Sequence, residues 1–307
     1  MDILLQQIIN GLVQGSIYAL VALGYTMVYG IMGLINFAHG EVVMIGTLVS
    51  ITVAGSLIEA GMPVSLAGMA GLSASVLACM ALGWGLERIA YRPLRNAPRL
   101  TPLITAIGMS IVLQNLAMMI WGRNYLTFPS FLPKIDFELA GANFTAIQVI
   151  IVVVSATTMG GLLLLVYRTK LGMAMRATAQ NPAVASLMGV NINRVIAAAF
   201  VIGSALGALA GVMVGSYYEI AHYQMGFMLG LKAFTAAVLG GIGNLAGAML
   251  GGVLLGIIEA LGAGYIGDLT GGFLGSNYQD IFAFVVLIVV LMFKPSGLFG
   301  EKTGDRA

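Results

Sequence analysis

Long uninterrupted apolar runs are the feature that most constrains this chain. Most are close to the roughly 20 residues that a helix needs to cross the hydrocarbon core of a bilayer. None alternates with the period of two that the strands of a membrane barrel would show. The sequence therefore predicts an all-α, polytopic helical bundle. The runs cover residues 7–33, 41–60, 63–90, 101–121, 145–167, 195–217, 231–267 and 273–293.

Composition excludes a water-soluble fold. Only 8% of the 307 residues are charged, 59% are hydrophobic, and the mean hydropathy is +0.99, whereas soluble domains carry about 25% charged residues. This is material for about eight to ten transmembrane helices. The run at 231–267 is too long for one crossing and is interrupted by glycines at 240–244, so we expect two segments there, the first short or re-entrant. We treat 1–307 as a single transmembrane domain.

Most basic side chains fall into three clusters. Basic residues beside membrane helices stay on the cytoplasmic side, so we expect a cytoplasmic loop at 168–194 and a periplasmic loop at 122–144. The side of the N-terminus stays open, because the run at 7–33 counts as either one crossing or two. The clusters are Arg88, Arg92, Arg95 and Arg99; Arg168, Lys170, Arg176 and Arg194; and Lys294, Lys302 and Arg306.

Glycines recur every four residues in two regions. Four residues advance about 400° around an α-helix, so each set is expected to form a stripe along one helix face. Such stripes let neighbouring backbones approach closely in a membrane, which predicts tight helix packing. A sharper alternative is that these helices slide past one another during transport. The sets are Gly203, Gly207, Gly211 and Gly215, and Gly243, Gly247 and Gly251.

Asn36, His39 and Glu41 stand between two apolar runs. Charged side chains in the hydrocarbon region are rare and usually line a polar pathway or pair with one another. Together with Gly40 they indicate a broken helix whose freed backbone groups face a cavity. Alternatively, Glu41 only caps the next helix, where the positive end of the helix dipole stabilises a carboxylate. The other histidine, His222, is distant in sequence and the single cysteine stands alone, so we predict no metal site.

Glu259 lies deep in an apolar run. Three roles are open for it: a proton relay, a partner for Lys232, or a residue near a helix end. The candidates for a substrate pathway are Asn36, His39, Glu41, Asn244 and Glu259.

The loop at 168–194 contains the pattern of a short capped helix. Asn181 suits the N-cap and Pro182 the first helical position, and Gly189 suits a left-handed stop. An apolar face in a basic loop predicts docking into the groove of a partner; the alternative is a helix resting on the membrane surface. The candidate coupling residues are Ala177, Gln180, Asn181, Pro182, Val184, Leu187, Met188 and Gly189.

The sequence shows no nucleotide-binding motif. It contains no Gly-Lys dipeptide, so the phosphate-binding loop of the Walker A type is absent. We also find no Ser/His/Asp or zinc-type spacing, which makes a membrane enzyme the weakest interpretation. We therefore predict no catalytic residues and no cofactor in this chain, and any ATP that drives it would be bound by another subunit.

Three stretches carry a resemblance to a known family that extends over essentially the whole chain. They are Gly33-Leu-Ile-Asn-Phe-Ala-His-Gly-Glu41, the segment from Arg176-Ala-Thr-Ala-Gln-Asn-Pro182 to Gly189, and Leu239-Gly-Gly-Ile-Gly-Asn-Leu-Ala-Gly247. In this order the chain resembles the LivH-type permease of bacterial ABC importers for branched-chain amino acids. In ABC permeases the docking loop carries Glu-Ala-Ala before a later Gly, and here Ala177-Thr178-Ala179 takes its place while Gly189 is kept.

The resemblance implies a multi-pass protein of the bacterial inner membrane within a heteromeric importer. A second, related permease would share the pore, and two cytoplasmic ATPases binding ATP and Mg would drive it. A periplasmic binding protein would deliver leucine, isoleucine or valine. No nucleic acid is implied.

A second hypothesis competes with this one. A proton-coupled secondary transporter would use Glu41 or Glu259 as a carrier, because a carboxylate in apolar surroundings can load and release a proton as access alternates.

Overall fold

We describe a computed structural model of the chain, covering residues 2–95, 97–98, 100–131, 135–139, 141–269 and 279–300. Three residues of the predicted basic clusters, Arg99, Lys302 and Arg306, lie outside the described residues.

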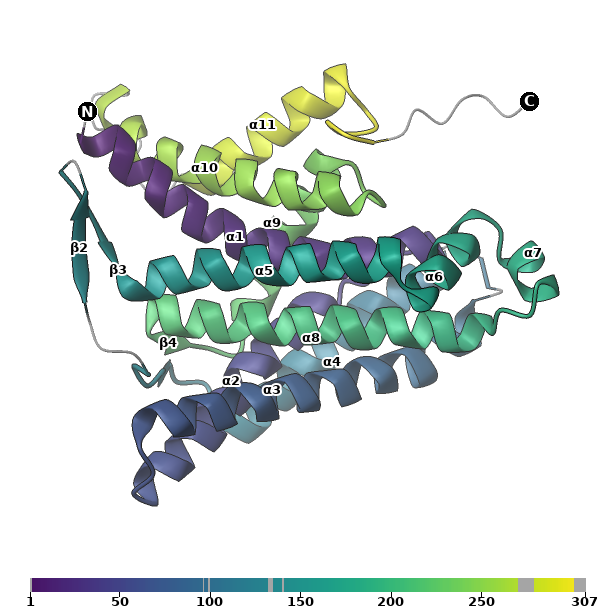
Figure 1. The fold of residues 1–307 in the computed structure, drawn as a ribbon, viewed down its shortest axis with the longest axis horizontal. Coiled ribbons are helices and arrows are strands. Elements are labelled where there is room, and N and C mark those ends of the chain that lie inside the picture. The colour runs from purple at the N-terminus through teal and green to yellow at the C-terminus, as the bar shows by residue number, and fades with distance from the viewer. Residues whose placement is uncertain are drawn as a thin grey trace.

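Helices form the body of the molecule, and short strand pairs join some of their ends (Figure 1). β1 pairs antiparallel with β4, and β2 with β3. The strands are β1 (Leu126–Thr127), β2 (Asp136–Leu139), β3 (Ala142–Thr145) and β4 (Ile220–Ala221). The helices are α1 (Asp2–Met32), α2 (His39–Glu59), α3 (Val64–Leu86), the π-helical turn η1 (Glu87–Tyr91), the 3₁₀ turn η2 (Arg92–Leu94), α4 (Leu100–Trp121), α5 (Ala146–Arg168), α6 (Lys170–Gln180), α7 (Pro182–Leu187), α8 (Ile192–Tyr218), α9 (Met225–Gly240), α10 (Leu245–Leu269) and α11 (Gln279–Phe293).

The predicted membrane bundle is confirmed. Within the described part of the chain, 7 helices are long and apolar enough to cross a membrane. Two shorter apolar helices add to them, α9 and the segment Phe284–Phe293 of α11. The expected division of the run at 231–267 is also present, because α9 ends at Gly240 and α10 begins at Leu245.

The basic clusters, as far as they are described, meet at one end of the bundle. Arg95 donates a hydrogen bond to Asn193 just before Arg194, so the first two clusters are adjacent. Residues 298 and 299, after Lys294, donate backbone hydrogen bonds to the C-terminal end of α9. The positive-inside rule predicts that this end, which we call the basic end, faces the cytoplasm.

The opposite end carries the strand pair β2–β3 and the start of α1 (Figure 1). The side chain of Gln6 donates to the backbone oxygen of Asn143 at 2.9 Å and accepts from its N–H at 2.8 Å. α1 is a single unbroken helix, which settles the open question about the run at 7–33. The start of α1 therefore lies at the same end as β2 and β3, away from α7.

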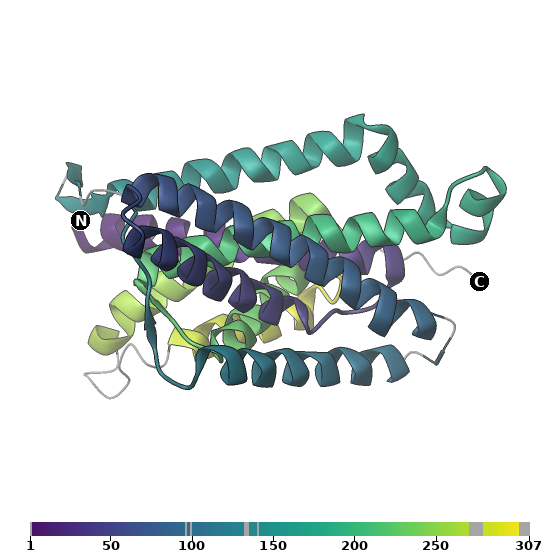
Figure 2. The same ribbon diagram turned by 90° about the horizontal axis from the view of Figure 1, so that it is seen from below.

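α1 is the central helix, whereas α4 and α5 lie on opposite sides of the bundle (Figure 2). In the most apolar stretch of α1, 78% of the residues are buried, against 22% in α4 and 28% in α5. The outer helices thus present apolar side chains to the surroundings, as a bundle in lipid must.

Glycines line the closest helix contacts. α1 and α10 pack at Gly15 and Gly256, where a side chain on Gly256 would collide with the backbone of Gly15. On α8, Gly203 faces the backbone of Gly24, and Gly211 faces the backbone oxygen of Val43. Of the remaining predicted glycines, Gly207 lies near His39, Gly215 against Phe128, Gly247 against Gly240 and Gly251 against Ala236.

Gly243 departs from the expected stripe. It lies in the turn between α9 and α10 with φ of 96°, and the only described neighbour of an added side chain is Tyr29 at 3.9 Å. A positive φ is available to glycine without steric cost, so this glycine serves the turn rather than a helix contact.

Candidate functional site

The helical structure is interrupted inside the bundle between α1 and α2, and we call this interruption the break. Gly33, with φ of 64°, follows the last turn of α1, and α2 begins at His39. The His39 ring packs against Gly24 and meets the Tyr25 ring edge-on at 5.0 Å between centroids. Gly24 precedes the end of α1 by about two turns, or about 12 Å of helix. α2 therefore starts well below the end of α1, inside the bundle, as a broken helix would.

Asn36, His39 and Glu41 are all buried at this break, and we call them, with Ser110, the break cluster. Ser110 donates a hydrogen bond to Glu41 Oε1 at 3.0 Å. The other oxygen, Oε2, has no hydrogen-bond partner among the residues that the structure describes. It lies beside Gly226 in the first turn of α9.

Glu41 thus matches both interpretations that the sequence left open, a place at a helix break and a place at the start of the next helix. It lies at the break, and it is also in the first turn of α2. The first turns of α2 and α9 meet here, because Gly40 packs on the backbone of Gly226. The positive ends of two helix dipoles therefore lie next to one carboxylate, which favours its negative charge.

A second group of polar residues lies between the break and the basic end of the bundle. The Tyr91 hydroxyl donates to Asn36 Oδ1 at 2.7 Å. Glu87, in the same π-helical turn, is fully buried and pairs with Arg92 at 2.8 Å and with Arg95. Since Arg95 also holds Asn193, side chains connect the break to the start of α8. The sequence did not lead us to predict Glu87 or Tyr91. The signal for Glu87 was a single acidic residue directly before a cluster of arginines.

α7 forms as the capping pattern predicts. The Asn181 side chain accepts a hydrogen bond from the Val184 N–H at 3.1 Å, Pro182 opens the helix, and Gly189 follows it with φ of 83°. Leu187 and Met188 are 86% and 81% exposed. Val184 is also exposed, and of the two α6 residues Ala177 is half-buried and Gln180 exposed. These side chains form an exposed surface at the basic end of the bundle.

Glu259 belongs to a separate set of charged residues, the charge network, formed by Tyr18, Lys232, Glu259 and Asp280. Lys232 Nζ lies 2.8 Å from Glu259 Oε1 and 2.8 Å from Asp280 Oδ1. The Tyr18 hydroxyl donates to Glu259 Oε2 at 2.7 Å. Of the three roles that the sequence left open for Glu259, the geometry matches a partner for Lys232. Asp280, missed by the sequence analysis, follows residues 270–278, which are not described.

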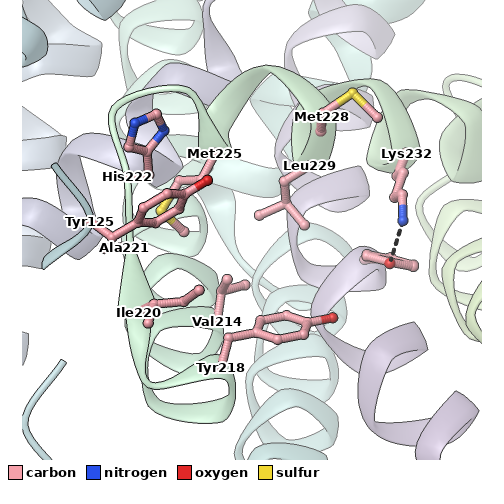
Figure 3. Close-up of a pocket in the computed structure, with 11 residues that line it drawn as sticks. Tyr125, Val214, Tyr218, Ile220, Ala221, His222, Met225, Met228, Leu229 and Lys232 are labelled. Carbon is pink, nitrogen blue, oxygen red and sulfur yellow. Dashed lines mark hydrogen bonds between the residues drawn. The ribbon is translucent and has the colours of Figure 1, made fainter. Parts of the chain in front are cut away.

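Two members of the charge network, Tyr18 and Lys232, line one end of a cavity of about 250 Å³. Figure 3 shows Lys232 at one end and Tyr125 and His222 at the other. β1 and β4, which pair beside Tyr125 and His222, belong to the end that carries the 122–144 loop. The lining residues are Tyr18, Tyr125, Val214, Tyr218, Ile220, Ala221, His222, Met225, Met228, Leu229 and Lys232. We call this the outer cavity.

The five residues predicted for a substrate pathway therefore fall into three places. Asn36, His39 and Glu41 share the break cluster, and Glu259 lies in the charge network. Asn244 belongs to neither: its side chain accepts from the Gly247 N–H at 3.0 Å and donates to the Phe299 backbone oxygen at 2.9 Å. It caps the start of α10 at the basic end of the bundle.

Comparison with known proteins assigns this chain to a family. The model of the family described as branched-chain amino acid transport system / permease component matches residues 7–291. The chain belongs to this family. The high-affinity branched-chain amino acid transport system permease protein BraD of Pseudomonas aeruginosa is 47% identical, over 98% of this chain and 97% of its own length.

Two further relatives extend the same comparison. The permease protein LivH of Escherichia coli K12, described in the same words, is 46% identical over 98% of this chain and 97% of the relative. A probable branched-chain amino acid transport permease protein LivH of Methanocaldococcus jannaschii is 28% identical, over 95% of this chain and 91% of the relative. The similarity thus covers the whole bundle, from α1 to α11.

Proposed function

We propose that this chain is the membrane-spanning permease subunit of an ABC importer that moves leucine, isoleucine and valine across the bacterial inner membrane. One observation carries the proposal: the 47% identity over nearly all of both chains to BraD, a branched-chain amino acid transport permease. The multi-pass helical bundle supports it, because a permease must offer a protein-lined route through the bilayer.

Other subunits supply the energy for transport and complete the transporter. Two cytoplasmic ATPases bind ATP and Mg, a second related permease completes the pore, and a periplasmic binding protein delivers the amino acid. The chain itself performs no covalent chemistry and needs no cofactor of its own. These partners are supported by the family resemblance and by the exposed apolar face of α7.

α7 is the docking element in this proposal. An amphipathic helix that offers apolar anchors to a hydrophobic groove is a common recognition mode. Leu187 and Met188 are the anchors, since each is more than four-fifths exposed. Closure of the ATPase dimer pushes on α7, and the Arg95 contact beside α8 transmits the motion toward Glu87, Tyr91 and the break.

The test uses the assembled complex. Leu187→Ser with Met188→Ser leaves the fold intact, because both side chains are exposed and surface changes usually alter stability by no more than about 0.5 kcal/mol. The ATPases should no longer co-purify with the variant, and ATP-driven leucine uptake into vesicles should fall to background. Met119→Ser is the matched control, an equally apolar side chain that is 80% exposed on α4, far from α7.

Unchanged ATPase binding and uptake in the double variant would contradict the docking role. A complex that takes up no leucine, isoleucine or valine with α7 intact would contradict the function itself. The proton-driven alternative gains no support from the relatives, which are named as components of a transport system.

A further inference from the structure

The buried acid Glu87 pairs with two cations. Arg92 donates to both of its carboxylate oxygens, from Nε at 3.2 Å and from Nη2 at 2.8 Å. Arg95 donates to Oε1 from its own Nη2. No other acidic side chain in the described part of the chain pairs with either arginine. The three side chains therefore carry a formal excess of one positive charge.

Both arginines line a cavity of about 490 Å³ at the basic end of the bundle. The Arg92 side chain is 31% exposed and that of Arg95 is 17% exposed, whereas Glu87 is fully buried and does not line the cavity. Nη1 of Arg92 has no hydrogen-bond partner among the described residues. The excess positive charge is therefore accessible from the cavity.

The walls of this cavity are partly apolar. Ile31 enters it from the end of α1, and Ile192 and Ile196 enter it from α8. Apolar walls lower the local dielectric constant and strengthen any contact between charges. The two-pronged contact with Arg92 already neutralises Glu87, so a second cation in this place adds a desolvation cost unless another anion meets it. A guanidinium group presents paired N–H donors, which suit a carboxylate.

The position of the cavity indicates where this carboxylate comes from. Pro182, the first residue of α7, lines the same cavity. Asn193, in the first turn of α8, lines it too and accepts a hydrogen bond from Arg95. A subunit that docks on α7 therefore lies next to the cavity and can extend a side chain into it.

We propose that this cavity, which we call the arginine cavity, receives an acidic side chain of the ATPase that docks on α7. The carboxylate binds the free Nη1 of Arg92 and brings the group of charges to neutrality. Because Glu87 shares the π-helical turn η1 with Tyr91, which donates to Asn36, this contact also connects the ATPase to the break. The inference rests on the proposed function and adds an electrostatic contact to the apolar contact at α7.

The first experiment needs no variant. Phenylglyoxal, which modifies arginine side chains, is applied to the two permease subunits in detergent, with and without the ATPases, and modified peptides are mapped by mass spectrometry. Arg92 should react in the absence of the ATPases and lose its reactivity when they are bound. Arg123, which is exposed beyond the far end of α4, should react equally in both samples.

Two results of this experiment would overturn the proposal. One is equal reactivity of Arg92 with and without the ATPases. The other is the same protection when phosphatidylglycerol is added in place of the ATPases, which would assign the cavity to a lipid headgroup.

The second experiment removes the excess cation. Arg92→Gln leaves Glu87 paired with Arg95. Binding of the ATPases to the variant, measured by titration in detergent, should weaken about tenfold or more at low salt, as expected for the loss of one charge-assisted hydrogen bond. The difference from the wild type should shrink at high salt, where charges are screened.

The matched control is Arg88→Gln. It removes the same charge from an exposed arginine in the same turn, which lies over the Trp84 ring and does not line the cavity. This variant should bind the ATPases as the wild type does. Equal affinities of the two variants would show that the arginine cavity receives no acidic group.

The two proposals fail in different ways. A wild-type complex that transports no branched-chain amino acid contradicts the proposed function, whatever the affinity of the ATPases. Normal transport by the wild type, together with equal ATPase binding by Arg92→Gln and Arg88→Gln, contradicts only the arginine cavity. If Arg92→Gln does not fold, the protection of Arg92 in the wild-type complex still decides.

Discussion

Glu41 and Glu259 are both buried carboxylates, yet the bundle holds them by different means. Glu259 has an ion pair with Lys232 and a hydrogen bond from Tyr18. Among the described residues, the Glu41 carboxylate accepts one hydrogen bond, from Ser110, and otherwise lies beside the first turns of α2 and α9. Ion pairing between side chains thus stabilises the charge network, whereas close packing of backbones stabilises the break cluster. The two should therefore be sensitive to different substitutions.

The largest effect is expected from Lys232→Met. Removing the cation leaves Glu259 and Asp280 without a countercharge, and breaking a buried pair in this way costs about 3–5 kcal/mol. Stability is measured by heating the protein in detergent with a thiol-reactive fluorophore, because Cys79 is the single cysteine and is buried. The unfolding temperature should drop steeply.

Lys170→Met, at an exposed lysine on α6, is the control for loss of a lysine. It should melt as the wild type does. Equal melting of the two variants would show that the charge network does not stabilise the bundle.

The break cluster should instead be most sensitive to Gly40→Ala. The new methyl group would collide with the Gly226 carbonyl and lie 2.9 Å from Gly230 Cα. These are backbone atoms of α9, and overpacking of this kind costs about 1–3 kcal/mol. Gly160→Ala on α5 is the matched control, since an added side chain there meets open space. It should be neutral or slightly stabilising, so the reverse order of the two melting temperatures would refute the close packing.

Two matched amide substitutions compare the carboxylates directly. Glu259→Gln breaks a charge-assisted contact with Lys232, a loss of about 1.5–3 kcal/mol, although Asp280 still pairs with that lysine. Glu41→Gln loses only the helix-dipole interaction, about 0.3–1 kcal/mol, and no longer buries a charge. In the same thiol assay Glu259→Gln should therefore melt lower than Glu41→Gln. A larger loss at Glu41 would reverse our comparison of the two regions.

The smallest effect is expected outside both regions, at the cap of α7. Asn181→Ala removes the hydrogen bond to the Val184 N–H, and losing such a cap costs about 1 kcal/mol. Hydrogen exchange of the α7 amides should speed up about fivefold, with little change in overall melting. Asn191→Ala removes the equivalent cap of α8, at 3.1 Å to the Arg194 N–H. Because α8 is long and packed, exchange should rise only in its first turn. Unchanged exchange of the α7 amides in Asn181→Ala would show that this cap does not stabilise α7.

Local features of the fold were predictable from the sequence. The apolar runs mark the helices because hydrophobic length is the dominant signal in a membrane. Asn181, Pro182 and Gly189 mark α7 because capping is set within a few residues. The glycine-rich stretch at 240–244 marks the division between α9 and α10 for the same reason.

Features that depend on distant residues were not predictable. Tyr18 and Glu259 are 241 positions apart in the chain, and no local spacing indicates that they meet. Asp280, on α11, joins the same network through Lys232. A four-residue spacing also misplaced Gly243 in a helix stripe, because periodicity does not distinguish the last turn of a helix from the loop that follows it.

The central claim is that this chain is a conduit driven by ATP hydrolysis in partner subunits. The most direct measurement is leucine accumulation in proteoliposomes containing either the whole importer with ATP and the binding protein, or the purified chain alone under an inward proton gradient. We predict accumulation in the first case only, and its loss when ATP is replaced by a non-hydrolysable analogue. Accumulation by the chain alone, driven by protons, would contradict the account.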